Sequence, residues 1–244
     1  MADNRKTGQD RTFDRGHPVP GWTGAPPPQR CILTGRHCRL VPLDMDHAAG
    51  LYRAFSTDQD NVIWDYLPYG PFGDIAAFEN FLGESCVGDD PLFYTIIDPA
   101  IDAPVGMASY LRPNPAHGVI EVGHINFSPL LQRRPAATES MYLMMRQVFV
   151  AWGYRRYEWK CNNLNDRSKR AALRLGFSYE GLFRQAVVFK GHNRDTAWFS
   201  ILDSEWPVVA AAFEAWLAPD NFDEAGRQRR GLADIRAGLA ATTG

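Results

Sequence analysis

The segment LLQRRPAATES, residues 130–140, joins a stretch typical of a strand to one typical of an amphipathic helix. Apolar and polar residues alternate in VIEVGHINF (119–127), whereas apolar residues recur at helical spacing in SMYLMMRQVFVAW (140–152). The junction contains Arg133, Arg134 and Pro135, followed by small residues. Because a helix N-terminus has unpaired N–H groups and a partial positive charge, this basic corner predicts an anion site. The alternative is an ordinary loop with solvated arginines.

The composition is that of a globular protein without a general attraction to polyanions. The 244 residues are 45% hydrophobic, which suits one domain of moderate size with extensions. A formal charge of −2 and a pI of about 6.3 predict neither a nucleic-acid partner nor a membrane partner. No stretch is typical of a signal peptide or a membrane span.

Cysteine usage favours a cytoplasmic protein without a metal site. The four cysteines form no CxxC pair and no His/Cys cluster with metal-ligand spacing; they are Cys31, Cys38, Cys86 and Cys161. We therefore expect reduced thiols, a cytoplasmic location and no bound metal.

The patterning divides the chain into three regions. Residues 1–30 are polar, rich in glycine and proline, and end in GAPPPQR, which predicts a flexible N-terminal arm. Residues 31–218 contain the regular hydrophobic patterns and are predicted to form one domain. Residues 219–244 are predicted to be a C-terminal appendage.

The order of the predicted elements indicates an α+β domain. Asp44 or Asp46 is suited to cap the first helix and Asp74 the second, while Gly176 is suited to end a later one. The predicted strands are 37–43, 92–98, 103–112, 119–128, 156–161 and the two that flank the turn KGHNRD, and the predicted helices are 47–56, 75–86, 140–152, 163–177 and 206–217. This order predicts a mixed, mostly antiparallel central sheet of about six to seven strands flanked by helices.

Several short motifs together resemble those of the GNAT N-acetyltransferases. QRRPAAT (132–138) stands in the place of a coenzyme A loop written Q/R-x-x-G-x-G/A, and Glu121 precedes Gly123 by two residues. Asn165-x-x-Ser168 is followed by RLGF (174–177) and EG (180–181). Over residues 33–206 the chain is similar to the branch of the ribosomal-protein N-terminal acetyltransferases. The resemblance implies the fold given above and acetyl-CoA as a co-substrate.

The resemblance assigns coenzyme-binding and catalytic roles to particular residues. Glu121 is the expected base for the attacking amine, and its alternatives are a cross-strand ion pair or a solvated position. Ser168 is expected to protonate the leaving thiolate, or else it packs as a small helix residue. Asn165 is a helix cap that can also bind the pantetheine arm. The residues implied to bind the coenzyme are Gln132, Arg133, Arg134, Ala136, Ala137, Thr138 and Asn165.

Strand alternation predicts which side chains accompany Glu121. Val119, Gly123 and Ile125 are expected on its face, and His124 on the opposite face as a buried, hydrogen-bonded histidine.

Two positions depart from the family pattern. Pro135 replaces the glycine of the phosphate loop and removes one N–H donor, for which Arg133 and Arg134 are expected to compensate. Many family members have a tyrosine, acting as general acid, four residues before the glycine of the GF pair, and here that position is Ala172.

The aromatic loop between the first two predicted helices is the expected acceptor pocket. Trp64, Tyr66 and Tyr69 suit an apolar group or an amine, and the alternative is a loop held by aromatic packing.

The resulting hypothesis is an N-acetyltransferase that transfers the acetyl group directly to a primary amine of a small molecule, an amino acid, or a peptide or protein N-terminus. It is expected to be a monomer or a homodimer. The alternative is a non-catalytic acyl-CoA-binding or interaction module of the same fold, which the missing glycine and tyrosine motivate.

Overall fold

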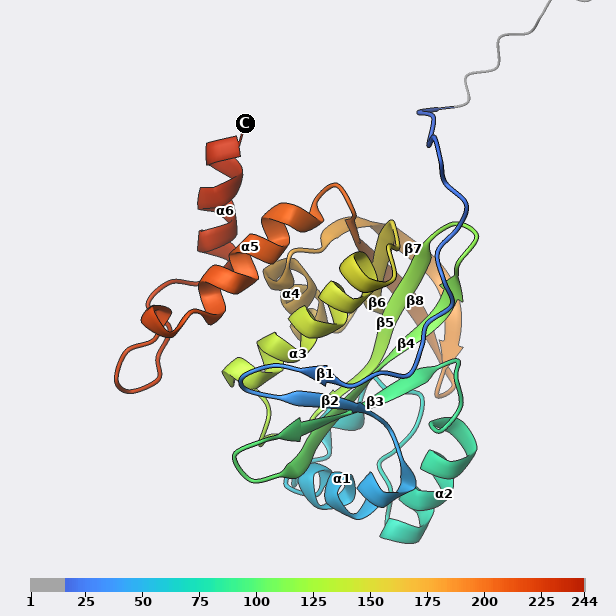
Figure 1. Cartoon of the computed structure of the whole chain (residues 1–244). Coiled ribbons are helices and arrows are strands. Elements are labelled where there is room, and N and C mark those ends of the chain that lie inside the picture. Colours follow the sequence, from blue (N-terminus) through green and yellow to red (C-terminus); the bar gives the residue numbers. More distant parts are fainter. Residues whose placement is uncertain (1–15, 244) are drawn as a thin grey trace, which may run out of the picture.

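The fold is built on one mixed sheet, described by a computed structural model over residues 16–243 (Figure 1). The strand order is β1-β2-β3-β4-β5-β6-β8-β7, and only the pair β5 and β6 is parallel within this described sheet. The strands are β1 Leu33–Thr34, β2 Arg39–Pro42, β3 Leu92–Asp98, β4 Ala103–Asn114, β5 Val119–Phe127, β6 Arg156–Asn162, β7 Ser178–Phe189 and β8 His192–Leu202. The predicted fold class is confirmed. The sheet has eight strands, rather than six to seven, because the chain before β2 folds back on it and adds β1.

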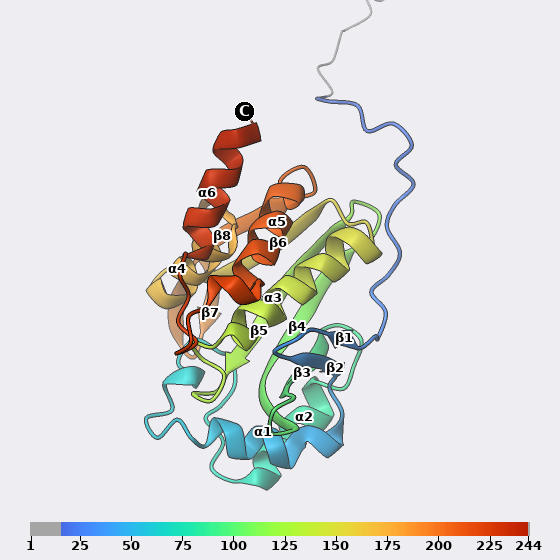
Figure 2. The same ribbon diagram turned by 60° about the vertical axis from the view of Figure 1, so that its left-hand side comes forward.

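Helices cover both faces of this sheet (Figures 1 and 2). α1 and α2 pack on one face together with Phe93 and Met107, whereas α3, α4 and α5 pack on the other face with Tyr94 and Ala108. Successive residues of β3 and β4 thus supply two separate cores. The helices are α1 Ala48–Phe55, α2 Ile75–Ser85, α3 Pro135–Arg146, α4 Asp166–Leu175, α5 Trp206–Leu217 and α6 Leu232–Thr243, with the helical turns η1 Met45–His47, η2 Val62–Trp64, η3 Gln147–Ala151 and η4 Pro219–Asn221.

Three helix boundaries lie where short-range chemistry predicts, whereas α3 begins at Pro135, before the predicted start at residue 140. Asp44, rather than Asp46, caps the first helical segment and forms a capping box with His47. The Asp74 carboxylate accepts from the Ala77 N–H. Gly176 ends α4 with φ +107°, a conformation that favours glycine.

A gap opens in the middle of the sheet between β5 and β6. Their pairing extends only from Val119 to Val122 on β5 and from Arg156 to Trp159 on β6. Both strands continue beyond these residues without pairing to each other, so the edge of each strand that faces the gap has backbone groups free to bind a ligand.

A bulge in β5 changes which side chains face this gap. His124 has φ +50°, and the register with β4 moves from Ser109↔Gly123 to Met107↔Asn126. Three residues of β5 therefore oppose two of β4, and Asn126 takes the face of Gly123 and Glu121. The expectation that Ile125 shares that face is wrong, because uniform alternation does not include a bulge.

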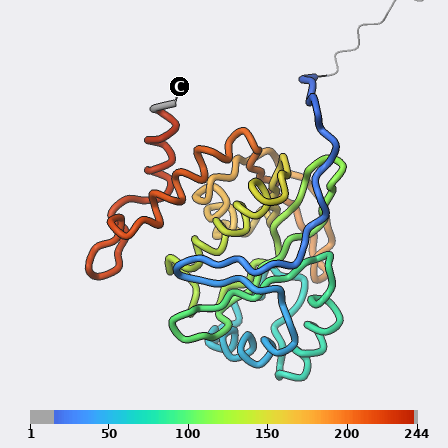
Figure 3. The backbone as a smooth tube through the Cα atoms, viewed as in Figure 1, coloured from blue at the N-terminus to red at the C-terminus, as the bar shows by residue number. Residues whose placement is uncertain are grey.

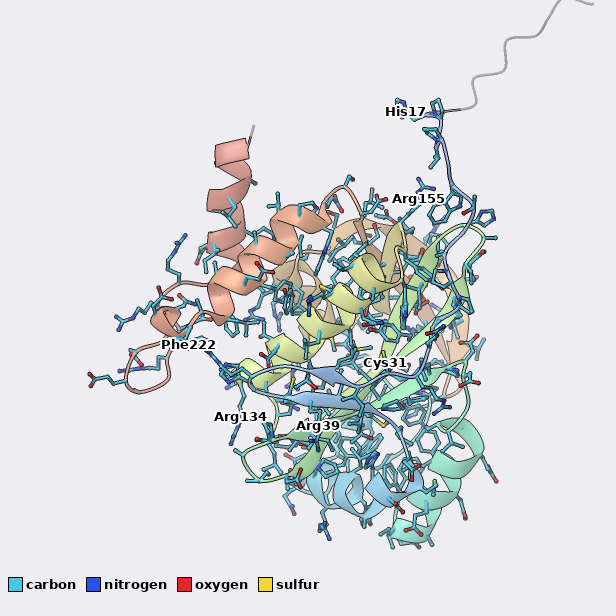
Figure 4. All side chains as sticks on the ribbon, viewed as in Figure 1. His17, Cys31, Arg39, Arg134, Arg155 and Phe222 are labelled. Carbon is cyan, nitrogen blue, oxygen red and sulfur yellow. The ribbon has the colours of Figure 1, made fainter. Side chains whose placement is uncertain are left out.

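Segments near both ends of the described chain contact the domain, whereas the first described residues extend away from it (Figure 3). Trp22 donates from Nε1 to the Ala116 carbonyl at 2.9 Å, and the Arg155 guanidinium, labelled in Figure 4, lies 5.5 Å from the Trp22 ring. Residues 1–15 of the predicted arm lie outside the described residues. At the other end, Leu232 and Ile235 of α6 are buried in the larger core. The predicted region boundaries remain predictions.

None of the helices within residues 16–243 combines the length and the apolar character needed to cross a membrane.

Candidate active site

A cavity of about 1710 Å³ lies at the gap between β5 and β6. Its walls include Glu121 from one face of the sheet and Trp159 from the other, so it reaches both sides. The elements that contribute are β4, β5, β6, β7, β8, the N-terminus of α3, the helix α4, the loop after α1 and the loop after α5.

The N-terminus of α3 forms the basic end of the cavity. Arg133 and Arg134 are exposed and line it, and Arg134 is labelled in Figure 4. No side chain caps this helix, and Pro135 occupies its first turn, where a missing N–H breaks no bond within the helix. Gln132 donates from Nε2 to the Phe127 carbonyl at 2.8 Å, so its amide supports the loop. Ala137 also lines the cavity, whereas Ala136 is buried in the core.

Two polar residues in the first turns of α3 have separate partners. Thr138 lines the cavity and accepts from Arg174 Nη1 at 3.1 Å. The Glu139 carboxylate is buried against the β1–β2 turn, where it accepts from the backbone N–H groups of Arg36, His37 and Cys38. Its negative charge is therefore neutralised away from the basic end of the cavity.

Asn165 and Ser168 lie beside the gap on α4. Asn165 Oδ1 accepts from the Ser168 N–H at 3.0 Å, as expected of a cap. Ser168 Oγ accepts from Trp159 Nε1 at 3.0 Å, which leaves its own hydroxyl proton available to donate. Ala172 is fully buried and offers no acidic group.

Cys161 lies close to Ser168 but does not have the character of a nucleophile. Burial raises the pKa of the Cys161 thiol, and the hydrogen bond with Ser168 only partly opposes this effect. The thiolate, which is the reactive form, is therefore disfavoured at neutral pH.

Glu121 is 4% exposed and forms two ion pairs across the strands. Its Oε2 lies 2.6 Å from Arg112 Nη1 and 2.8 Å from Lys160 Nζ. Lys160 also pairs with Glu158 at 2.9 Å and lies 3.7 Å from the centroid of the Trp198 ring. The ion-pair alternative is thus present. It leaves Oε1 outside both pairs, and Glu121 still lines the cavity.

The structure separates the three aromatic residues of the predicted acceptor pocket. Tyr66 is exposed, lines the cavity and donates to the Leu164 carbonyl at 3.1 Å. Trp64 is 4% exposed and packs edge-to-face on Phe55 and Phe72, so it does not line the cavity. For Trp64 the packing alternative describes the structure.

Tyr69 does not line the cavity either, but it contacts His124, which does. Its ring stacks on the His124 ring at an interplanar angle of 10°, and its hydroxyl lies 3.1 Å from Nδ1. Burial lowers the pKa of His124 to about 4, so the imidazole is neutral at pH 7. The predicted hydrogen bond is present, but the side chain is half-buried rather than buried. Its ring also contacts Phe93, on the face of the sheet that carries Glu121. The expectation that His124 lies on the opposite face is therefore wrong, because the bulge changes the alternation.

Sequence reasoning missed a wall supplied by the C-terminal region. Phe222 and Arg227, from the loop between α5 and α6, line the same cavity as Arg134, and Figure 4 labels Phe222 and Arg134. Trp216 Nε1 donates to Gln228 Oε1 at 2.8 Å, and the Arg174 guanidinium lies 5.2 Å from the Trp216 ring. The basic run RQRR (227–230) was the available signal, but no periodicity connects it to the domain.

Sequence reasoning pointed only to Arg194, which either meets an acidic acceptor or is solvated, and it missed the other members of a group of polar side chains in the cavity wall. Their buried polar atoms have no hydrogen-bond partner among the described residues; the four are Asn126, Arg194, Thr196 and Trp198. Within residues 16–243, no group of three or more His, Cys, Asp or Glu side chains is arranged to hold a metal ion.

A mixed sheet that separates between two parallel strands, with a basic helix N-terminus beside the gap, defines an acyl-group transferase of the GNAT type. The family model described as acetyltransferase (GNAT) domain matches residues 37–178. The chain therefore belongs to the GNAT acetyltransferase family.

Solved structures agree with this assignment. A GCN5-related N-acetyltransferase from Brucella melitensis is 48% identical, with a TM-score of 0.88 over 90% of this chain and 100% of the other. A probable acetyltransferase of the same family from Chromobacterium violaceum is 41% identical, with a TM-score of 0.73 over 79% of this chain and 96% of the other. A comparison with functionally curated proteins finds no match.

Two more distant structures share the fold alone. The self-immunity acetyltransferase MccE for microcin C7, in complex with acetyl-CoA and AMP, is 20% identical, with a TM-score of 0.61 over 69% of this chain and 93% of the other. A putative ribosomal-protein-serine acetyltransferase from Vibrio cholerae is 18% identical, with a TM-score of 0.61 over 70% of this chain and 97% of the other.

Proposed function

We propose that the chain is an acetyl-CoA-dependent N-acetyltransferase that acts on a primary amine without an acyl-enzyme intermediate. The observation that carries this proposal is the cavity at the β5–β6 gap, which has a basic end at α3 and Glu121 and Ser168 in its walls. Family membership supports acetyl-CoA as the donor, and the raised pKa of the Cys161 thiol argues against a covalent intermediate.

The basic end suits the phosphates of coenzyme A. Arg133 and Arg134 supply charge, and the uncapped N-terminus of α3 supplies N–H groups and a partial positive charge. Arg170 of α4 and Arg227 of the C-terminal loop add cations to the same end. The pantetheine arm would then extend through the gap, where β5 and β6 have free backbone groups.

In the proposed reaction the amine nitrogen attacks the thioester carbonyl carbon, the C–N bond forms and the C–S bond breaks. Glu121 or a water next to it takes the proton from the amine and passes it to solvent. The coenzyme A thiolate takes a proton from Ser168 while a solvent water returns one to the serine oxygen. Backbone N–H groups of β5 at the gap are positioned to stabilise the oxyanion. Most of the rate enhancement would come from holding the two reactants together.

The branch of the family is part of the proposal. The sequence resembles the ribosomal-protein N-terminal acetyltransferases, and the Vibrio cholerae structure shares the fold. The acceptor class proposed from the sequence is a primary amine on a small molecule, an amino acid or a peptide end.

The test combines binding with turnover. Acetyl-CoA binding is measured by isothermal titration calorimetry, and release of the free thiol is then followed across a panel of amines. Binding together with thiol release that depends on an amine supports the enzyme. Tight binding without thiol release for any amine supports the non-catalytic module, and an absence of binding contradicts both.

A further inference from the structure

Strand β8 presents a row of polar side chains to the part of the cavity that lies on the same face of the sheet as Glu121. Arg194, Thr196 and Trp198 alternate along the strand and therefore share one face. In the register with β6, Thr196 lies opposite Asn162 and Trp198 lies opposite Lys160. This is the face of the sheet on which Lys160 meets Glu121, so the row lies on the same side as the proposed base.

The row has hydrogen-bonding capacity that the protein does not use. Arg194 Nε, Thr196 Oγ1 and Trp198 Nε1 are buried without a partner in the described chain. The arginine and tryptophan nitrogens only donate, so they require an acceptor. Buried polar groups in folded proteins are nearly always paired, and such a row in a cavity wall indicates a ligand that accepts hydrogen bonds.

The charges around Arg194 indicate that this ligand is an anion. The two carboxylates on the same face are already engaged, because Glu121 pairs with Arg112 and Lys160, and Glu158 pairs with Lys160 and Arg156. No carboxylate within residues 16–243 forms a salt bridge with Arg194. Burial lowers the pKa of its guanidinium, and the charge of Glu121 opposes this effect only in part.

The pantetheine arm does not satisfy this requirement. Its amides are neutral, and the phosphates of coenzyme A are expected at the α3 end of the cavity, where Arg133 and Arg134 lie. The acceptor is therefore the remaining source of an anionic group next to Arg194.

Hydrogen bonds between the loops beside the cavity indicate the size of that acceptor. Lys190, at the tip of the β7–β8 hairpin, donates from Nζ to the carbonyls of Trp64 at 3.2 Å and Gly70 at 3.3 Å. Tyr66 donates to the Leu164 carbonyl at 3.1 Å. The bonds of Lys190 hold the loop after α1 against β7–β8. The bond from Tyr66 to Leu164 joins two residues of the cavity wall, which narrows this side of the cavity and favours a small molecule.

We propose that the acceptor is a small molecule that carries a carboxylate near its amine, and that Arg194 and Thr196 bind this carboxylate. The proposal rests on the proposed acetyl transfer. Positions two apart along a strand are separated by about 6.6 Å, a distance that one carboxylate bridges when an arginine supplies one donor. The amine would then be directed toward Glu121, and Trp198 Nε1 and the Asn126 amide would bind further polar atoms of the acceptor.

The experiment uses matched acceptors. Thiol release from acetyl-CoA is measured for the common amino acids, for their C-terminal amides and for the corresponding decarboxylated amines. Aminoalkyl phosphonates distinguish a carboxylate from a phosphate-like anion. We expect kcat/KM to be at least about tenfold higher for a carboxylate than for its matched amide, because the amide leaves the buried cation unpaired.

Variants test whether the polar row on β8 causes the preference for a carboxylate over its matched amide. R194Q should reduce the carboxylate preference about tenfold, mainly through the acceptor KM, and R194K should restore part of it because lysine keeps the charge without the planar fork. R184Q removes an exposed arginine of β7 that does not line the cavity and should keep the full preference.

Three outcomes would overturn the inference. They are equal rates for amino acids and amides, a preference for phosphonates, and an R194Q variant that weakens acetyl-CoA binding instead. Binding of the amino acid and its amide to the enzyme–coenzyme A complex, measured by calorimetry, tests the carboxylate site even without turnover. If acetyl-CoA itself does not bind, the proposed function fails, which is distinct from an enzyme that binds it and prefers neutral amines.

Discussion

Glu121 illustrates, at the scale of single residues, how one carboxylate serves structure and is proposed to serve chemistry. Its Oε2 forms ion pairs with both Arg112 and Lys160, whereas Oε1 takes part in neither pair. A buried ion pair is weak grounds for stability, but a carboxylate held rigidly at a cavity wall is well placed for proton transfer. The two roles predict different consequences of losing the charge.

The substitution Glu121→Gln separates these roles. If Glu121 is the base, kcat/KM should fall about 100-fold, because the amide of glutamine cannot accept the proton of the amine. The free energy of unfolding should fall by about 1–3 kcal/mol, because Lys160 keeps Glu158 as a partner. The measurements are kcat/KM against pH and urea unfolding.

Glu158→Gln is the matched control. Glu158 shares Lys160 with Glu121 but does not line the cavity. The substitution Glu158→Gln should lower the free energy of unfolding by about as much as Glu121→Gln while changing kcat/KM only slightly. Equal losses of activity in the two variants would restrict Glu121 to a structural role.

His124 predicts how stability depends on pH. Its pKa is about 4 when folded, against an ordinary value of 6.5, so between these values the unfolded chain binds more protons than the folded chain. Stability attributable to this residue is therefore present above pH 6.5 and is lost as the pH falls toward 4, by up to about 3 kcal/mol. His124→Asn suits the positive φ and should remove this part of the slope in urea unfolding between pH 4 and 7. A slope identical to that of the unmodified protein would contradict the assignment.

At the scale of secondary-structure elements, helix α3 determines how the coenzyme end is built. Pro135 gives the first turn its conformation but supplies no N–H, so the phosphates are expected to use later N–H groups and the charges of Arg133 and Arg134.

Pro135→Ala adds the missing donor without the flexibility of glycine. We expect the Kd for acetyl-CoA to decrease by roughly 10- to 100-fold, because a hydrogen bond to a charged group contributes about 1.5–3 kcal/mol. Calorimetry measures the change. Pro207→Ala, in the first turn of α5, is the control and should leave the Kd unchanged. If Pro135→Ala binds acetyl-CoA with the same Kd as Pro207→Ala, the phosphates lie away from the first turn of α3.

The strands and helices were largely predictable because their signals are local. Caps such as Asp74 and breakers such as Gly176 act within one turn, and the stripe of apolar residues on α3 follows from its period. The bulge at His124 was not predictable, because it depends on the pairing of β5 with β4. Composition likewise marked the loop of Trp64 as aromatic but did not reveal that Trp64 fills a core while Tyr66 lines the cavity.

At the scale of the whole molecule, the cavity combines segments that are far apart in sequence. The motifs of residues 132–138 and 165–168 identified two of its walls. From the row on β8 the sequence pointed only to Arg194. The rest of the row and the loop after α5 were missed, because neither has a local pattern that shows which way its side chains point. Both are recognised only after the sheet order places β8 beside β6 and α6 anchors the C-terminal loop.

This arrangement predicts that the C-terminal segment is part of the domain rather than a separable appendage. Leu232 is 1% exposed in the larger core, and the loop between it and α5 carries Phe222 and Arg227 to the cavity. Leu232→Ala should therefore lower the free energy of unfolding by about 2–5 kcal/mol and should also raise the KM for acetyl-CoA.

Two further variants test whether packing of Leu232 in the core affects the binding of acetyl-CoA. Leu173→Ala, at a position that is 48% exposed on α4, should change neither quantity appreciably. Arg227→Gln should raise the KM for acetyl-CoA with little loss of stability, because its side chain is 81% exposed. Urea unfolding and steady-state kinetics give both quantities. An unchanged midpoint and KM in Leu232→Ala would show that α6 folds independently of the site, and the C-terminal loop would then have no part in binding the coenzyme.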